Sequence, residues 1–308
     1  MKNLNNNLHA AKKNKNDEFY TRFEDIEREL AHYKDHFKGK TVFCNCDDPV
    51  SSNFVKYFAL CFEHLELKRL IVTHYDNNVP SYWVDITHGI NNLEEMVAYQ
   101  PLPLAQNGDF RSNESINFLK QSDIVVTNPP FSLFREYLAQ LIEYEKKFLI
   151  IGSFNAVTYK EVFPLIKDNK IWLGHNLVKE FVTPSGEIQK FGNIVWYTNL
   201  PHKKRNEELK LFRIYHENEE HYPKYDDYDA IEVSKTVDIP KDFKGLMGVP
   251  ISFLDKYNPK QFEILGLDDH RLIYPKWRGR GPNLNGKAVY RRIIIKNKMI
   301  QELHGEDI

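Results

Sequence analysis

Asn128, Pro129, Pro130 and Phe131 form a tetrapeptide directly after the apolar run 123–127 (DIVVT). The two prolines fix φ and lack an N–H, so the carbonyls of Asn128 and Pro129 are free to face a cleft instead of joining a ladder. The Asn128 side-chain carbonyl beside a backbone carbonyl makes a pair of acceptors that suits an amino group. Phe131 adds an aromatic face for a planar ring.

This pair of acceptors favours methyl transfer to an exocyclic amine, whose lone pair is conjugated into its ring. Acceptors that bind both amine protons favour the pyramidal nitrogen that develops in the transition state. The remaining requirement is in-line positioning against a methyl group on a sulfonium, with no metal or covalent intermediate. A base in duplex DNA must first be flipped out, with Phe131 stacking on it. The competing interpretation, a rigid strand-to-helix turn, is disfavoured by the α/β pattern around the motif.

Strand-like and helix-like segments alternate around this motif. We expect strands over residues 41–44, 67–74, 123–127 and 148–152, and helices over 23–37, 51–64, 132–144 and 159–167. Residues 171–173, 193–198 and 289–295 are further strand candidates. The alternation predicts the α/β class, with a parallel sheet covered on both faces. Ligands of such sheets bind at the carboxyl ends of the strands.

The composition bounds the class of protein. The 308 residues, 42% of them hydrophobic, suffice for one large or two modest domains. The net charge of -1 excludes a strongly basic or strongly acidic chain, so any nucleic-acid contact must come from local patches. The three cysteines lack the C-x-x-C spacing of a metal or redox site, and no stretch has signal-peptide or membrane-spanning character. We expect a cytoplasmic protein without a metal, and a monomer is the favoured state.

The composition also changes along the chain. Residues 1–16 are rich in Asn and Lys, with almost nothing to bury, which predicts a flexible basic arm. From about residue 200 onward, charged runs and an acidic Tyr-rich stretch replace the regular alternation. We therefore divide the rest of the chain into domains at 17–200 and 201–308.

The sequence resembles the EcoRI-like adenine-specific DNA methyltransferases. The matching blocks are DEFYT (17–21), VFCNCDDPVSSNF (42–54), GDFRS (108–112), DIVVTNPPFSLFREYL (123–138), GNIVWYTNL (192–200) and GVPISFLDKYNPKQFEILG (248–266). The resemblance implies a Rossmann-like S-adenosylmethionine-dependent methyltransferase fold, with a catalytic domain at 17–200 and a target-recognition region at 201–308. It also implies sequence-specific methylation of a flipped adenine in double-stranded DNA, either beside a restriction endonuclease or alone.

The resemblance further implies where the cofactor binds. The cofactor-binding residues are Phe19, Tyr20 and Thr21 at the amino-acid part, Cys44, Asp47, Asp48 and Pro49 under the methionine and ribose, Asp76 at the ribose hydroxyls, and Asp109 and Phe110 at the adenine ring. The turn after the expected strand 41–44 has no Gly-rich loop, so this assignment depends on the resemblance. The competing interpretations are a helix-starting turn at 47–49, a loop acid at Asp76 and a β-turn at Asp109.

Recognition of the duplex requires positive charge. The candidate DNA-binding residues are Lys276, Arg278, Arg280, Arg291 and Arg292, because arginine suits guanine edges and both residue types suit phosphates. The alternatives that the residues leave open are an RNA or protein-glutamine amino-methyltransferase with the same motif, and a non-catalytic DNA-binding protein.

Overall fold

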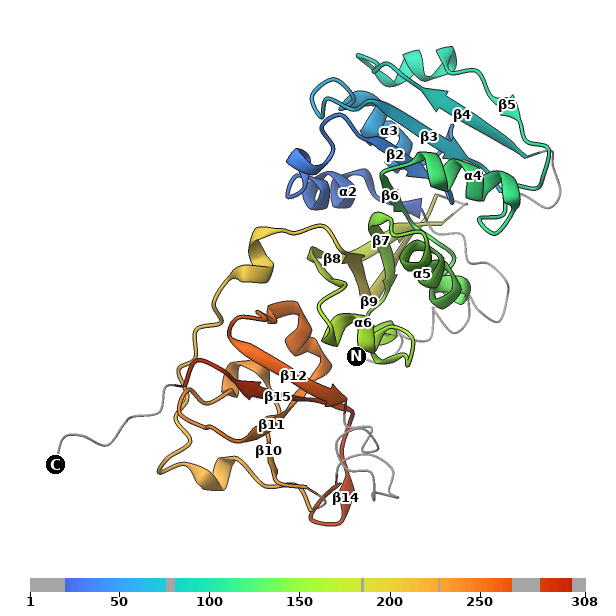
Figure 1. Ribbon diagram of the computed structural model, residues 1–308. Helices are drawn as coiled ribbons and strands as arrows, with labels where there is room; N and C mark the ends of the chain where they lie inside the picture. Colours follow the sequence, from blue (N-terminus) through green and yellow to red (C-terminus); the bar gives the residue numbers. More distant parts are fainter. Residues whose placement is uncertain (1–19, 76–80, 184–185, 227, 268–282, 301–308) are drawn as a thin grey trace. The chain divides into compact units, whose positions relative to one another are not determined.

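The computed structural model describes residues 20–75, 81–183, 186–226, 228–267 and 283–300 (Figure 1). The chain divides into two compact units. Unit 1 comprises residues 1–156 and 171–202, and unit 2 comprises 157–170 and 203–308. The boundary expected near residue 200 differs from this division in the segment 157–170. Its helix α6 (Phe163–Lys167) packs against a strand of unit 2, which explains the difference.

Unit 1 contains a nine-stranded mixed sheet in the order β1-β8-β9-β7-β6-β2-β3-β4-β5. Its strands are β1 (Tyr20–Thr21), β2 (Thr41–Cys44), β3 (Arg69–Thr73), β4 (Tyr82–Ile86), β5 (Leu102–Pro103), β6 (Ile124–Thr127), β7 (Lys147–Ser153), β8 (Trp172–Val182) and β9 (Ile188–Thr198). The neighbours β7, β6, β2 and β3 are parallel, as the alternation predicted, and antiparallel strands extend the sheet on both sides. The two short strands expected over 171–173 and 193–198 belong to the longer pair β8 and β9.

Helices cover both faces of this sheet. They are α2 (Phe23–Leu30), α3 (Asn53–Leu60), α4 (Asn113–Gln121) and α5 (Phe134–Glu143), with short 3-10 helices η1 (Lys34–His36), η2 (Leu93–Ala98), η3 (Phe131–Leu133) and η4 (Phe154–Thr158). Strand β2 shows the alternation that separates the faces. Val42 and Cys44 pack into the core that α2 and α3 cover, whereas Phe43 contacts Phe118 of α4 on the opposite face, with 6.2 Å between the ring centroids.

The helix expected over 23–37 is shorter in the structure. Helix α2 ends at Leu30, and Tyr33 leaves the helical region with φ -125° and ψ 9°. Tyr33 and Phe37 are nevertheless buried. The spacing of apolar residues at three and four positions therefore reported burial correctly and overestimated the length of the helix.

Unit 2 contains a four-stranded sheet in the order β10-β11-β15-β12. Its strands are β10 (Ala230–Glu232), β11 (Leu246–Pro250), β12 (Phe262–Leu267) and β15 (Arg292–Asn297), and a hairpin is formed by β13 (Asn283–Leu284) and β14 (Lys287–Ala288). The 3-10 helices are η5 (Lys203–Asn206), η6 (Glu219–His221), η7 (Thr236–Asp238) and η8 (Ile251–Lys256). The strand expected over 289–295 begins three residues later, at Arg292.

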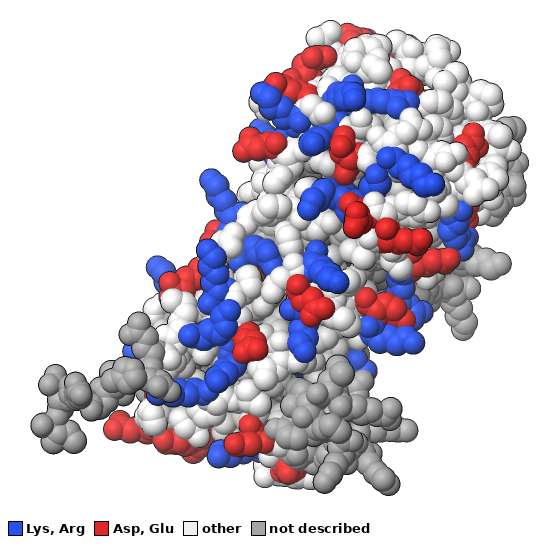
Figure 2. Space-filling view, viewed as in Figure 1, with Lys and Arg blue, Asp and Glu red and all other residues white. Residues whose placement is uncertain are grey.

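Charges of both signs are interspersed on the face shown in Figure 2, in keeping with the small net charge. Within the described ranges, no helix is long and apolar enough to cross a membrane. Among the same residues, no group of three or more His, Cys, Asp or Glu side chains is arranged to hold a metal ion.

Candidate active site

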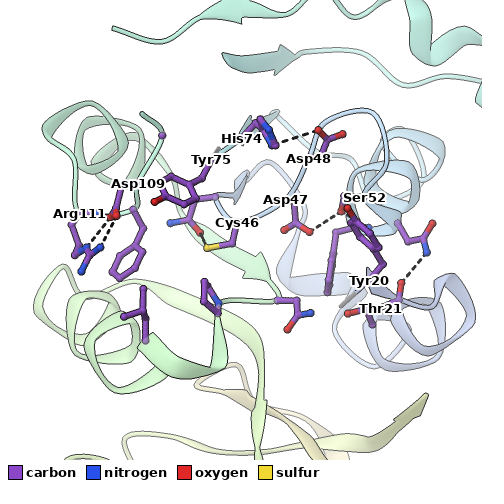
Figure 3. A pocket seen from close by; sticks show the side chains of 18 residues that line it. Tyr20, Thr21, Cys46, Asp47, Asp48, Ser52, His74, Tyr75, Asp109 and Arg111 are labelled. Carbon is purple, nitrogen blue, oxygen red and sulfur yellow. Dashed lines mark hydrogen bonds and ion pairs between the residues drawn. The ribbon is translucent and has the colours of Figure 1, made fainter. Parts of the chain in front are cut away.

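A cavity of about 350 Å³ lies in unit 1 (Figure 3). Its walls come from the segments that follow β2, β3 and β6, together with β1, the start of α3 and the loop before α4. Because β2, β3 and β6 are parallel, their carboxyl ends meet at one edge of the sheet, which is where an α/β sheet binds ligands. The lining residues are Tyr20, Thr21, Asn45, Cys46, Asp47, Asp48, Ser52, Asn53, Phe54, His74, Tyr75, Gly108, Asp109, Phe110, Arg111, Asn128, Pro130 and Leu133.

The tetrapeptide at 128–131 leads from β6 into the helices that follow. Asn128 and Pro130 line the cavity, and Pro130 caps the short helix η3 by accepting a hydrogen bond from the Leu133 N–H at 3.0 Å. Phe131 is half-buried and packs edge-on against Phe181, with 6.3 Å between the ring centroids. The prolines thus bring the chain across the end of the sheet, with Asn128 at the cavity wall.

Asp47 joins three parts of the cavity wall. Its Oδ1 accepts a hydrogen bond from Ser52 Oγ at 2.7 Å, and its Oδ2 accepts one from Thr127 Oγ1 at 2.5 Å. Ser52 in turn caps α3 by accepting from the Phe54 N–H. Burial raises the pKa of Asp47 to about 6, although both hydroxyl hydrogen bonds oppose that rise. Asp47 therefore connects the turn after β2 to Thr127, the residue that precedes Asn128.

Asp48 builds the adjacent corner of the cavity. It accepts hydrogen bonds from the N–H groups of Val50 and Ser51, both at 2.8 Å, and from Tyr82 Oη at 2.7 Å. His74 Nδ1 lies 3.4 Å from its Oδ2. Burial favours the neutral acid, but the hydrogen bonds from Tyr82 and the two N–H groups outweigh burial and lower the pKa of Asp48. Asp48 is thus an ionised carboxylate at the cavity wall.

Asp109 and Arg111 form a bidentate ion pair on the opposite wall (Figure 3). Arg111 Nε and Nη2 donate to Oδ1 and Oδ2 of Asp109 at 2.8 and 2.6 Å. The hydrogen bond from Arg111 lowers the pKa of Asp109 despite partial burial. The guanidinium also lies 5.2 Å from the centre of the Phe110 ring. The aromatic ring and the ionised acid expected at this position are therefore side by side.

Two buried polar atoms in the cavity wall have no hydrogen-bond partner among the described residues. They are Nδ2 of Asn45 and Oγ1 of Thr21. The Asn45 side chain is only 2% exposed, and its Oδ1 accepts a hydrogen bond from Tyr137 of α5. Thr21 is 4% exposed, and its backbone carbonyl accepts from Asn53 Nδ2 at 2.8 Å. Buried polar groups are normally satisfied, so these two atoms are positions at which a ligand or an ordered water completes the hydrogen bonds.

The sequence analysis missed Asn45 and Tyr137. Asn45 follows strand β2 directly, and this placement was an available signal, because residues just past a parallel strand face the ligand edge. Tyr137 gave no local signal, since its contact with Asn45 joins residues 92 positions apart. Its helical spacing indicates only burial, which it also has.

Several of the expected site residues lie away from the cavity. Cys44 points into the core on the α3 side of β2, so its assignment to the cofactor is corrected, whereas Cys46, which lies in the same turn, lines the cavity. Burial raises the pKa of the Cys46 thiol, which keeps it from acting as a nucleophile. Pro49 and Pro129 are buried behind the wall, and Phe131 is beside it. Phe19 and Asp76 lie outside the described residues.

The expected DNA-binding arginines behave differently from one another. Arg292 donates through Nε and Nη2 to the buried carboxylate of Glu232 at 2.6 to 3.0 Å, so its guanidinium is occupied inside unit 2. Its assignment to DNA contact is therefore corrected. Arg291 is exposed, and its Nη1 donates a long hydrogen bond to the carbonyl of Thr158 at 3.4 Å. Lys276, Arg278 and Arg280 lie outside the described residues.

Sequence comparisons identify the class of this protein. A family model described as "Adenine-specific methyltransferase EcoRI" matches residues 7–298. The type II methyltransferase M.EcoRI of Escherichia coli is 48% identical over 96% of this chain and 97% of its own. The type II methyltransferase M.MpnI of Mycoplasma pneumoniae is 41% identical over 94% of this chain and 98% of its own. No solved structure gives a significant match.

The matches define a methyltransferase, and they agree with the activity that the tetrapeptide 128–131 at the end of β6 predicted. The chain belongs to the EcoRI family of adenine-specific methyltransferases, which confirms the resemblance seen in its sequence blocks. Its activity is adenine-specific methylation of DNA.

Proposed function

We propose that the methyl donor is S-adenosylmethionine and that the acceptor is the exocyclic amine of an adenine flipped out of double-stranded DNA. The observation that carries this proposal is the position of Asn128 in the wall of a cavity lined by acids, amides and aromatic rings. The cavity and the amine-binding motif share one edge of the sheet. A methyl donor in the cavity is therefore next to an amine held by the motif.

The residues present fit S-adenosylmethionine. A volume of about 350 Å³ falls within the range of small-molecule sites. The unsatisfied Asn45 Nδ2 is a donor for an acceptor atom of the cofactor, and Thr21 Oγ1 both donates and accepts. Asp109 and Phe110 offer an ionised acceptor beside an aromatic face, which suits an adenine ring. When bound, S-adenosylmethionine supplies an electrophilic methyl group on a sulfonium.

The chain itself binds and orients the acceptor amine. The Asn128 Oδ1 and the backbone carbonyl of Pro129 accept the two amine protons, and this arrangement strengthens as the nitrogen becomes pyramidal. The side of the Phe131 ring that faces away from the core stacks on the extruded base. Asp47 keeps Thr127, and with it the start of the motif, fixed to the turn after β2. These groups position the amine and exclude water, and no side chain has to form a covalent bond.

We further propose that unit 1 is a Rossmann-like catalytic domain and that unit 2 carries the target-recognition region. Four parallel central strands with helices on both faces support the first assignment. The second is supported by the exposed cations that unit 2 carries beside β15. The residues that determine which DNA sequence is methylated lie in this region, whether the enzyme accompanies a restriction endonuclease or acts alone.

Asn128→Ala tests the proposal. The variant should lose at least about 10²-fold in methylation rate, because it removes one transition-state acceptor. Its affinity for S-adenosylmethionine, measured by calorimetry, should stay near that of the parent. The matched control is Asn117→Ala, which alters an exposed asparagine of α4. Near-normal methylation by the Asn128 variant would exclude the catalytic role, and lack of S-adenosylmethionine binding by the parent would exclude the cofactor.

A further inference from the structure

The β13–β14 hairpin of unit 2 is a rigid, anchored element. Its turn residues Asn285 and Gly286 both have positive φ, at 51° and 73°, which is the backbone that an Asn-Gly hairpin turn requires. Asp226 holds this turn through hydrogen bonds. Its carboxylate accepts from the N–H groups of Asn285 and Gly286 at 3.0 and 2.7 Å, and its own N–H donates to the carbonyl of Asn283 at 2.9 Å.

Side-chain packing also holds this hairpin in place. Leu284 and Val289 pack against a buried cluster that includes Tyr225, Tyr228 and Ile294. Lys287 in the hairpin, and Tyr290 and Arg291 just after it, are nevertheless exposed on a backbone that this packing holds in place. Hydrogen bonds and packing together make the exposed side chains of this segment a preorganised surface.

The exposed residues include an aromatic ring that lies between two cations in the chain. Tyr290 is 88% exposed, the largest fraction among the large hydrophobic side chains of the described residues. Lys287 and Arg291 are exposed on either side of it in the chain, and neither forms an ion pair with a described residue. Arg292 turns the other way, into its ion pair with Glu232. The nearest turn acid, Asp226, has both oxygens occupied by backbone N–H groups.

A second exposed aromatic residue of unit 2 shows why this arrangement is unusual. Phe212 is 80% exposed, but the adjacent cation, Arg213, pairs with Asp238 at 3.2 Å. Singly exposed apolar residues are common and need no partner. An aromatic ring between two cations that form no ion pair with a described residue, on an anchored hairpin and the segment that follows it, matches a ligand that has anionic groups and flat apolar surface in alternation. The phosphates and the sugar or base surfaces of DNA have this pattern.

We propose that Lys287, Tyr290 and Arg291 form a DNA-contact surface, in which the two cations hold phosphates and the Tyr290 ring packs on a sugar or base in the groove. This assignment rests on the proposed function, with duplex DNA as the substrate. It adds an aromatic contact to a region in which only cations were expected to act. Lys287 takes the place of Arg292, which was expected to contact DNA but is paired with Glu232.

The test measures binding of the full-length protein to a mixed-sequence DNA duplex across a salt series. Tyr290→Ala should weaken binding about 10-fold without changing the salt slope, and Tyr290→Phe should retain most of the affinity, because the ring makes the contact. Lys287→Ala and Arg291→Ala should each reduce the salt slope by about one. Phe212→Ala is the matched control and should bind like the parent.

If all three alanine variants keep the affinity and the salt slope of the parent, the proposed DNA-contact surface is wrong. A loss confined to the two cation variants would overturn the ring contact. Polyglutamate that competes with DNA and shows the same dependence on Tyr290 would assign the surface to an acidic protein instead. Failure of the proposed function is separate, because the parent would then fail to bind or methylate DNA. Hydrogen exchange at the β15 amides that matches the parent shows that unit 2 of each variant is folded.

Discussion

Each unit contains a buried polar cluster in which a tyrosine donates a hydrogen bond to a side-chain oxygen, but the two clusters differ in how their acids are paired. At the cavity of unit 1, Tyr137 donates to Asn45, and Asp47 is held by two neutral hydroxyls. In unit 2, Tyr225 donates to Glu232, whose charge is matched by Arg292.

The difference lies in what each cluster leaves unsatisfied. The unit 2 cluster is internally paired, and even Gly248 is fitted to it, since a Cβ there would lie 2.1 Å from Tyr225 Oη. Among the residues that the structure describes, the cavity cluster instead keeps a buried carboxylate without a cation and an amide donor without a partner. Internal pairing is what a scaffold requires, and unsatisfied groups are what a binding site requires.

The largest expected effect is on the paired cluster. Glu232→Gln leaves the Arg292 charge buried without its counter-ion, and we expect unit 2 to lose about 3–5 kcal/mol of stability. Hydrogen exchange at the β15 amides measures this loss, while S-adenosylmethionine binding by unit 1 should persist. The control is Asp238→Asn, which removes the exposed pair with Arg213 and should cost less than about 1 kcal/mol. A comparably small loss at Glu232 would contradict the scaffold interpretation.

The next effect is a pH dependence at the unpaired acid. The pKa of Asp47 rises from 3.8 to about 6 on folding, so the folded chain binds the proton more tightly than the unfolded chain. The stability from this group is present at low pH and is lost as pH rises from about 4 to above 6. At about 1.4 kcal/mol for each pKa unit, the loss reaches about 3 kcal/mol.

Asp47→Asn should remove this dependence. Denaturant unfolding between about pH 4 and pH 7.5 should show the variant gaining stability relative to the parent as the pH rises. The parallel Asp48→Asn variant should not show that gain, because hydrogen bonds lower the pKa of Asp48 instead. A constant difference between parent and Asp47→Asn across the range would show that Asp47 titrates as it does in the unfolded chain.

The two clusters also show how far the sequence could be read. The four parallel strands and the motif at their edge were predictable, because period-two burial and the residues after each strand are local signals. The family resemblance, and not these local signals, assigned Asp47, Asp48, Asp109 and Phe110 to the cofactor, and all four line the cavity. The sequence analysis assigned Arg292 to DNA, because nothing near that residue in the chain indicates that Glu232 lies opposite it 60 positions away.

The remaining differences have two origins. Cys44 was assigned to the cavity because it adjoins the turn, although the alternation of β2 turns its side chain to the core. The alternation along β2 was therefore a local signal for Cys44. The segment 157–170 was assigned by its order in the sequence, whereas its packing against β12 decides its unit. Contacts between distant residues decided the outcomes for Arg292 and for the segment 157–170, and composition and periodicity carry no record of those contacts.

The smallest expected effect compares the two buried tyrosines directly. Tyr137→Phe removes the hydrogen bond that orients the Asn45 amide and leaves the packing of the ring intact. A neutral hydrogen bond of this kind is worth about 1 kcal/mol, so S-adenosylmethionine affinity should fall about 5-fold. Tyr225→Phe removes the corresponding bond in unit 2 and should leave that affinity unchanged, with any cost appearing in stability alone. Calorimetric titration of both variants beside the parent distinguishes these outcomes. Equal cofactor affinity in the Tyr137 variant and the parent would show that the Asn45 donor needs no such support, and the two clusters would then differ only in charge.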